Sequence, residues 1–260
     1  MSNHVILIAD HASVRTITVN RPDKLNALNQ QTMQALDRAF QDAAAADDVR
    51  AVILTGAGPK AFVAGADIAE MNDLSAIEGR EFSLLGQQLM RRIERMPNPV
   101  IAMINGFALG GGLELAMACH LRIAAATAGL GQPEINLGLI PGFGGTQRLL
   151  RLIGRAAALE LCLLGLPIDA ARALQLGLVN RVVEADVLHE ETLALAQRLA
   201  TSAPLALRGI LDAVVFGGEC AIEEGLQLET AQFALLFATD DMREGTRAFL
   251  EKRPAQFRNR

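Results

Sequence analysis

An apolar run, three consecutive glycines and a second apolar run follow one another near the middle of the chain. Val100–Ile104 predicts a buried strand, and residues 113–121 predict a buried helix. The glycines at 110–112 stand between them, and a backbone without side chains can approach a ligand closely. The first N–H groups of a helix have no partner within the helix and lie at the positive end of its dipole. This junction is therefore suited to stabilise an oxygen that gains negative charge.

Strands and helices alternate in the same way along the first part of the chain, which predicts an α/β core with parallel strands. Strands at 5–9 and 14–19 predict a hairpin, and a helix is expected to begin after Asn29 as its N-cap. The last part is mostly helical, so we expect a core at residues 1–200 and a helical lobe at residues 201–260. The later helices are predicted at 188–199, 205–216, 222–236 and 242–252, and a further strand of the core at 51–55.

Composition and charge exclude several classes of partner. With 260 residues, of which 51% are hydrophobic, the chain can bury one sizeable core. A net charge of −5 without a Lys/Arg-rich tract argues against nucleic acid or a membrane as the partner, and no apolar stretch has membrane-spanning length. Cys119, Cys162 and Cys220 are too few for a disulfide framework or a zinc site, so we expect reduced core thiols and no bound metal. Without a signal-type leader, the expected location is cytoplasmic.

The signatures of other common enzyme classes are missing from the sequence. There is no G-x-S-x-G motif of a hydrolase, and His189 lacks the second histidine of a zinc-protease helix. The glycines near 110 and at 142–145 do not have the spacing of a dinucleotide-binding loop, and residues 56–60 do not form a Walker loop. The glycines must therefore serve another purpose.

Two glutamates lie in apolar, glycine-rich surroundings. Glu114 falls in the first turn of the predicted helix, and Glu134 follows a proline in the irregular segment 131–148. Two carboxylates in one apolar pocket suit general acid–base catalysis, because burial and mutual repulsion separate their pKa values. We expect Glu114 to favour the ionised form and Glu134 the protonated form. The alternatives are that Glu114 only interacts with the helix dipole, that Glu134 is a solvated loop residue, and that the glycines serve tight packing.

A third segment follows the strand at 51–55, where small residues precede an acidic residue and a short helical pattern. Asp67 is predicted to be the N-cap of that helix, with a purely structural side chain. The N–H group of Ala66 lies at the same helix entrance, and it is the group that we expect to bind a ligand.

Together, these segments resemble the enoyl-CoA hydratase (crotonase) family over nearly the whole chain, from residue 20 to residue 253. The resemblance implies a spiral of repeated β-β-α units with a C-terminal helical trimerisation region. It also implies a homotrimer or a homohexamer built as a dimer of trimers, a coenzyme A thioester as substrate, and no metal or redox cofactor. The motifs that carry it are residues 64–68 (AGADI), 105–116 (NGFALGGGLELA) and 131–148 (GQPEINLGLIPGFGGTQR).

The resemblance also implies a role for individual residues. The N–H groups of Ala66 and Gly111 would bind the thioester carbonyl as an oxyanion hole. Glu114 would be the base that deprotonates water for attack on the β-carbon, and Glu134 would be the acid that protonates the α-carbon. The implied contacts to coenzyme A are Lys24, Leu25, Ala64, Ala66, Asp67, Ile68, Phe249 and Lys252, the last two from this subunit or a neighbouring one.

The chain departs from the family pattern at three positions. Ala69 replaces a basic residue that often contacts the coenzyme, Leu130 stands where phenylalanine is common, and Pro254 comes one place early. Retention of both glutamates favours hydration of a 2-trans-enoyl-CoA to 3-hydroxyacyl-CoA, as in fatty-acid β-oxidation or a related degradation. The alternatives are an isomerase that shifts a double bond from the 3 to the 2 position, and a non-catalytic acyl-CoA-binding protein. The sequence does not predict the length of the acyl chain.

Overall fold

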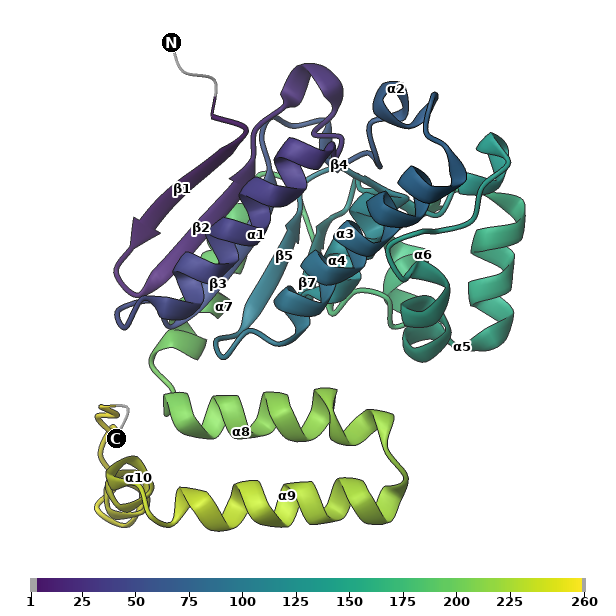
Figure 1. The fold of residues 1–260 in the computed structure, drawn as a ribbon. Coiled ribbons are helices and arrows are strands. Elements are labelled where there is room, and N and C mark those ends of the chain that lie inside the picture. Colours follow the sequence, from purple (N-terminus) through teal and green to yellow (C-terminus); the bar gives the residue numbers. More distant parts are fainter. Residues whose placement is uncertain (1–3, 259–260) are drawn as a thin grey trace.

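The strands of this protein form two sheets, and from β3 to β8 successive strands alternate between them (Figure 1). The computed structural model describes residues 4–258. The larger sheet has the strand order β1-β2-β3-β5-β7-β10, and the smaller has the order β4-β6-β8-β9. Pairing is parallel except between β1 and β2 and between β8 and β9. The strands are β1 (Ile6–His11), β2 (Val14–Val19), β3 (Ala51–Gly56), β4 (Ala61–Val63), β5 (Val100–Ile104), β6 (Phe107–Leu109), β7 (Leu121–Ala125), β8 (Gly129–Gly131), β9 (Ile168–Asp169) and β10 (Arg181–Val183).

Each repeat consists of a strand in the larger sheet, a strand in the smaller sheet and a helical segment. The series β3-β4-α3, β5-β6-α4 and β7-β8-α5 shows this three times, and it confirms the expected spiral of β-β-α units. The helices are α1 (Gln30–Ala45), α2 (Ile68–Met71), α3 (Ala76–Glu94), α4 (Gly111–Ala118), α5 (Gly145–Leu164), α6 (Ala170–Gln175), α7 (Leu188–Ala200), α8 (Pro204–Val215), α9 (Ile222–Leu236) and α10 (Asp240–Leu250), with 3-10 turns η1 (Pro22–Lys24), η2 (Glu134–Leu137) and η3 (Gly217–Glu219).

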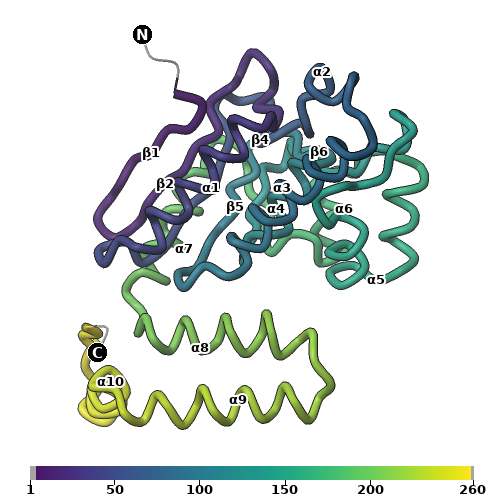
Figure 2. Tube along the Cα trace, viewed as in Figure 1, coloured from purple at the N-terminus to yellow at the C-terminus, as the bar shows by residue number. Residues whose placement is uncertain are grey.

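Helices cover both faces of the larger sheet, which explains why its central strands are continuously apolar. In β3, Val52 and Leu54 point into the core beneath α1, α3 and α4, whereas Ala51 and Ile53 pack against α7 on the other face. The tube in Figure 2 shows α1 and α3 in front of the strands and α7 behind them. The central strands are thus rigid supports, and the segments that leave their carboxyl ends build the site.

Most predicted elements are confirmed with boundaries within two residues, and the end of one predicted helix is further off. The hairpin forms from β1 and β2, and the side chain of Asn29 accepts a hydrogen bond from Thr32 N at 2.9 Å as the N-cap of α1. The predicted helix at 113–121 ends earlier, because Cys119 has an extended backbone (φ −74°, ψ 149°) and Leu121 already begins β7. Apolar runs of this kind are typical of both a buried helix and a buried strand, so the pattern alone does not mark the change.

The C-terminal helices lie apart from the sheets. In Figures 1 and 2, α8 and α9 run side by side below the core, and α10 lies across the end of α9. Arg151 of α5 pairs with Glu219 of η3 at 2.7 Å, and the guanidinium of Arg95 lies over the ring of Phe216, so an ion pair and a cation–π contact connect the lobe to the core. Between residues 4 and 258, no single helix is long and apolar enough to cross a membrane; α7 and α8 pass that test only as a pair bent by 106°.

Candidate active site

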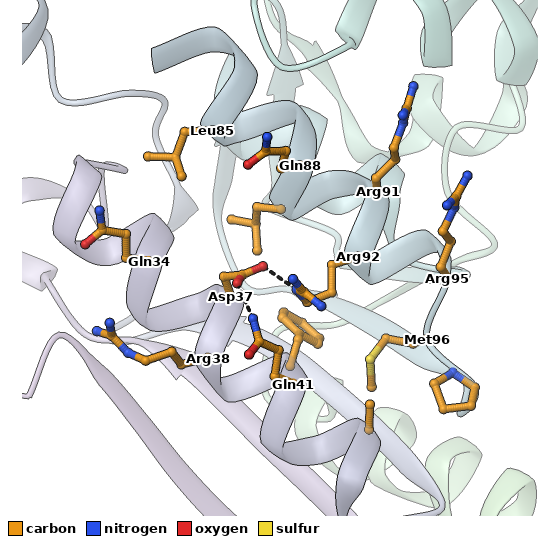
Figure 3. Close-up of a pocket in the computed structure, with 14 residues that line it drawn as sticks. Gln34, Asp37, Arg38, Gln41, Leu85, Gln88, Arg91, Arg92, Arg95 and Met96 are labelled. Atoms are coloured by element: carbon orange, nitrogen blue, oxygen red, sulfur yellow. Dashed lines mark hydrogen bonds and ion pairs between the residues drawn. The ribbon is translucent and has the colours of Figure 1, made fainter. Parts of the chain in front are cut away.

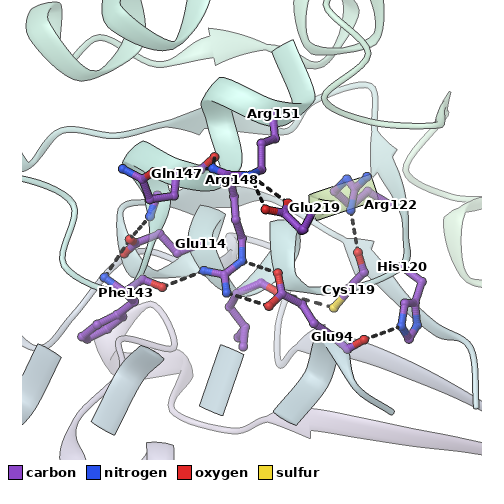
Figure 4. Close-up of polar contacts among 12 residues, drawn as sticks. Glu94, Glu114, Cys119, His120, Arg122, Phe143, Gln147, Arg148, Arg151 and Glu219 are labelled. Atoms are coloured by element: carbon purple, nitrogen blue, oxygen red, sulfur yellow. Dashed lines mark hydrogen bonds and ion pairs between the residues drawn. The ribbon is translucent and has the colours of Figure 1, made fainter. Parts of the chain in front are cut away.

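Glu114 is a buried carboxylate with two backbone partners. All eight residues of α4 are buried, and Glu114 itself is 1% exposed. Its Oε1 accepts hydrogen bonds from the N–H groups of Phe143 at 2.8 Å and Gly145 at 2.6 Å (Figure 4). A side chain on Gly145 would leave no room, since a Cβ there would lie 2.9 Å from the same oxygen. Burial raises the pKa of Glu114 to about 7, and the nearby charge of Glu134 adds to this, while the two N–H groups oppose it.

Glu134 is the first residue of η2, so the predicted irregular segment contains a short 3-10 turn at this point. Its carboxylate lies beside the start of α4, since a Cβ on Gly110 would be 2.8 Å from Glu134 Oε1. Burial raises the pKa of Glu134 to about 7 as well. The alternative of a solvated loop carboxylate therefore does not fit the structure.

Gln132 is a functional candidate that the sequence analysis did not single out. Its side chain is fully buried, and the amide nitrogen, oriented by its neighbours, donates to both oxygens of Glu134 at 2.9 and 3.0 Å. The same amide approaches the position where a Cβ on Gly145 would lie, next to Glu114. Gln132 thus lies between the two glutamates and orients one of them. A glutamine placed between glycine and proline in an apolar segment was the available signal.

The structure brings the two glutamates together, but it does not separate their pKa values as expected, because both are raised to about 7. Their hydrogen bonds still distinguish them. Glu114 accepts two backbone N–H groups, and the positive charge of Arg148 further favours its ionised form, whereas Glu134 has its own backbone N–H group and the side-chain amide of Gln132 as partners. One proton shared by the pair is therefore held more readily on Glu134.

The N–H groups of Ala66 and Gly111 are free in the part of the chain that the structure describes, where neither donates a hydrogen bond. Gly111 is the first residue of α4, and Ala66 lies two residues before α2. Gly112 serves a different purpose, because a Cβ there would lie 1.8 Å from Val63 O of β4. The three glycines thus combine tight packing of the helix on a strand with an N–H group that has no hydrogen-bond partner, so both interpretations of them hold.

The segment that carries Ala66 is held by residues far away in the sequence. Leu28 accepts a hydrogen bond from Asp67 N and donates one to Gly65 O, both at 2.8 Å, and Ala64 N donates to Leu25 O at 3.0 Å. Asp67 is the N-cap residue of α2 by position, but its side chain makes no capping hydrogen bond. It pairs instead with Arg21 at 2.8 Å, so its structural role is to join the two segments.

The predicted coenzyme A contacts fall into two groups. Leu25, Ala64 and Ile68 lie in the joined segments beside Ala66, and the exposed Lys24 precedes them. Phe249 lies in the last turn of α10 and Lys252 two residues beyond its end, and Figure 1 shows α10 at the opposite end of the molecule from α2. One subunit therefore does not bring both groups to one site. Phe249 is 82% exposed, so it is not a core residue of this chain either.

Two of the departures from the family pattern have a clear place in the structure. Ala69 is an exposed residue of α2, next to the segment that carries Ala66. Leu130 is fully buried in β8, opposite Ile168 of β9, so it belongs to the core of the smaller sheet.

A surface cleft of about 520 Å³ lies between α1 and α3 (Figure 3), and none of the predicted site residues lines it. Asp37 in this cleft pairs with Arg92 and accepts a hydrogen bond from Gln41. Among residues 4–258, no group of three or more His, Cys, Asp or Glu side chains could hold a metal ion. The candidate catalytic groups thus lie around Glu114 and Glu134 and outside this cleft.

A buried and a partly buried carboxylate beside two unengaged helix-entrance amides form the arrangement of an acid–base enzyme that stabilises an oxyanion. Residues 9–260 match the model of the enoyl-CoA hydratase/isomerase family. The chain is 46% identical to the short-chain-enoyl-CoA hydratase of Clostridium acetobutylicum and 47% identical to the crotonyl-CoA hydratase of Syntrophomonas wolfei, over 99% of each chain in both cases. It superimposes on the crystal structure of an enoyl-CoA hydratase from Bacillus anthracis with a TM-score of 0.96 at 39% identity, covering 99% of this chain and all of that one. The protein belongs to the enoyl-CoA hydratase/isomerase family.

Proposed function

We propose that the protein is an enoyl-CoA hydratase, which adds water to a 2-trans-enoyl-CoA and forms a 3-hydroxyacyl-CoA. The observation that carries the proposal is the pair Glu114, which is buried, and Glu134, which is partly buried: both have a pKa raised to about 7, and they are close enough for the charge of Glu134 to raise the pKa of Glu114. Such a pair can remove one proton and deliver another at neutral pH. The names of the two bacterial relatives, a short-chain-enoyl-CoA hydratase and a crotonyl-CoA hydratase, support the same reaction.

In the proposed mechanism, the substrate first binds to the two free backbone amides. The thioester carbonyl accepts hydrogen bonds from Ala66 N and Gly111 N, which stabilise the negative charge that develops on this oxygen as the β-carbon is attacked. Ionised Glu114 takes a proton from water, and the hydroxide oxygen bonds to the β-carbon. Protonated Glu134 gives its proton to the α-carbon. After one turnover the proton has moved from Glu134 to Glu114, and exchange with solvent restores the starting state.

We also propose that the reaction needs no cofactor beyond the coenzyme A of the substrate. Two carboxylates account for both proton transfers, and two amides account for the developing charge, so a metal or redox group has no step to perform. Lys24, Leu25, Ala64, Asp67 and Ile68 are the proposed contacts for the coenzyme, together with Phe249 and Lys252 of a neighbouring subunit.

The neighbouring subunit follows from a proposed homotrimer, or a hexamer of two trimers, in which residues 201–260 form the oligomerisation lobe. Large apolar side chains of the lobe are exposed in the single chain, among them Phe249 at 82%, Leu250 at 80% and Ile222 at 73%. A monomer rarely leaves so much apolar surface in contact with water.

The proposed location is the cytoplasm, in fatty-acid β-oxidation or a related acyl-CoA degradation. The described residues include three free cysteines and no disulfide, which fits a reducing compartment. Cys119 is a core thiol as predicted, whereas Cys162 is half-buried and Cys220 is exposed.

The test is an assay with crotonyl-CoA in heavy-oxygen water. A hydratase incorporates the label into the hydroxyl group of 3-hydroxybutyryl-CoA. An isomerase instead converts a 3-enoyl-CoA into a 2-enoyl-CoA without label, and a binding protein retains crotonyl-CoA unchanged. Either of these results would overturn the proposal. A series of enoyl-CoA substrates of increasing length, ranked by kcat/KM, then defines the acyl chain.

A further inference from the structure

An ion pair lies directly behind the turn that binds Glu114 (Figure 4). Arg148 Nε and Nη2 donate to the two carboxylate oxygens of Glu94 at 2.6 and 2.9 Å, so the contact is bidentate. The remaining nitrogen, Nη1, donates to the carbonyl of Phe143 at 2.8 Å. Because the N–H group of Phe143 binds Glu114, one residue of this turn connects the guanidinium to the carboxylate.

The turn leaves space for this guanidinium because residue 144 is glycine. Gly144 has φ +103°, a backbone conformation that residues with side chains rarely adopt, and a Cβ at this position would lie 2.3 Å from Arg148 Nη1. The start of the turn is held from α3, where Ser83 Oγ and Gln87 Nε2 donate to Gly142 O at 2.6 and 3.1 Å. The start of the turn is thus held by three side chains that do not touch Glu114.

Arg148 also acts on Glu114 through its charge. The guanidinium side chain is only 15% exposed, and its positive charge lowers the pKa of Glu114, against the effect of burial. Other titratable groups face Glu114 from the surrounding elements. These are Glu134 of η2, Cys162 of α5 and, behind Arg148, Glu94 of α3.

We propose that Arg148, held by Glu94, is a positioning residue for Glu114: it fixes the 143–145 turn whose N–H groups orient the carboxylate, and its charge favours the ionised form. The proposal rests on the proposed role of Glu114 as the base. It assigns to Arg148 no contact with substrate, because its three polar contacts are already made to Glu94 and Phe143.

The first experiment replaces Arg148 by methionine, which keeps the length of the side chain and removes its charge and donors. We expect kcat for crotonyl-CoA hydration to fall about tenfold to a hundredfold, with KM little changed, since a misplaced catalytic group costs this much. The acidic limb of the pH profile should move to higher pH, because Glu114 then loses a proton less readily. Arg151→Met is the matched control, since Arg151 lies one turn further along α5 in an exposed ion pair with Glu219.

Two conservative variants separate charge from position. Arg148→Lys keeps the charge but cannot form the bidentate contact, so kcat should fall while the acidic limb stays in place. Glu94→Gln leaves the charge of Arg148 unneutralised, so the acidic limb should move to lower pH. If both variants fold and show the kcat and the pH profile of the unchanged protein, the proposal is wrong, even if Arg148→Met does not fold.

A measurement that does not depend on catalysis can test the positioning role of Arg148 separately from the proposed hydratase activity. The carboxyl stretching band of Glu114, identified as the infrared signal lost in Glu114→Gln, can be titrated in each variant. A titration that moves to higher pH in Arg148→Met supports the positioning role even if the protein proves not to hydrate crotonyl-CoA. An unchanged titration with an unchanged kcat overturns the positioning role and leaves the hydratase proposal intact.

Discussion

Helices α4 and α9 differ sharply in how the fold uses them. All eight residues of α4 are buried, including Glu114, whereas none of the fifteen residues of α9 is buried in the single chain. Both segments are rich in apolar residues, and hydrophobic patterning predicts both as helices. The difference shows that one chain alone buries the apolar side chains of the core. The apolar side chains of the lobe can be buried only against a second surface. The raised pKa values of Glu114 and Glu134 come from burial in the core.

The largest effect is expected from Glu114→Gln in α4, with Glu229→Gln in α9 as the matched change in the lobe. Replacing the carboxylate by an amide removes the base but keeps the size of the side chain, so kcat should fall about a thousandfold. Glu229 is exposed, and its variant should keep full activity. Initial rates of crotonyl-CoA hydration measure both, and circular dichroism verifies the fold. Equal activity of the two variants would remove the distinction between the two helices.

The pH dependence of stability should show the same contrast. The pKa of Glu114 is about 7 in the native protein against an ordinary value of 4.5, so the native state binds more protons than the unfolded state between these values. The free energy of unfolding should therefore fall as pH rises through this window, by at most about 3 kcal/mol for this group, and stay level above it. Urea unfolding at about pH 5 and about pH 8 measures the difference. Glu114→Gln should reduce it to the part that comes from Glu134, whose pKa is also raised to about 7, and Glu229→Gln should leave it unchanged.

Phe233→Asp tests whether the exposed face of the lobe is covered by another subunit. Phe233 is 63% exposed in the single chain, so the change should barely affect the core. If the face is buried between subunits, a charge there should weaken association by about 2 kcal/mol or more. Sedimentation velocity would show a shift from an oligomer towards the 27.7 kDa chain. Thr246→Asp, at an exposed polar position of α10, is the control. If the protein without any substitution sediments as a monomer, the proposed trimer is contradicted.

The smallest effects compare two helix caps. Asn29 caps α1 over the core, and Thr239 caps α10 in the lobe by accepting from Met242 N at 3.1 Å. Replacement of either by alanine should cost about 1 kcal/mol. For Asn29 the loss should appear in global unfolding, because α1 packs on the sheet. For Thr239 it should appear first as faster hydrogen exchange of α10, as expected for a segment with few buried contacts. Identical exchange changes for the two variants would mean that lobe and core unfold as one unit.

The sequence pattern predicted helices and strands well where the spacing of apolar residues is typical of only one of the two. The strands at 14–19 and 100–104, the cap Asn29 and the helix at 222–236 follow from short-range chemistry alone. The end of α4 did not, because Cys119 leaves the helix to enter a buried strand, and both states favour apolar residues. A boundary of this kind depends on the neighbouring strand β5, which pairs with β7.

The candidate site was predicted in its four central groups through motifs, and its supporting groups were missed. Gln132 and Arg148 lie in quoted motifs, but their partners are Glu134 two residues away and Glu94 more than fifty residues away. The equal pKa values of the two glutamates were also missed, since they depend on how deeply each side chain is buried. Sequence spacing indicates that two acids share a pocket, and only the tertiary structure decides how much water each one retains.

The strap formed by residues 25–28 and 64–67 has a consequence for how binding energy is used. The strand-like pairing of Leu28 with Ala66 attaches the amide of Ala66, the proposed donor to the thioester carbonyl, to the stretch that begins at Lys24, where the coenzyme is proposed to bind. We therefore expect binding at one end of this pair of segments to stiffen the other end. A thioester that lacks its nucleotide should be turned over more slowly rather than merely held less tightly, because the distant grip helps to align the amide at the reacting carbonyl.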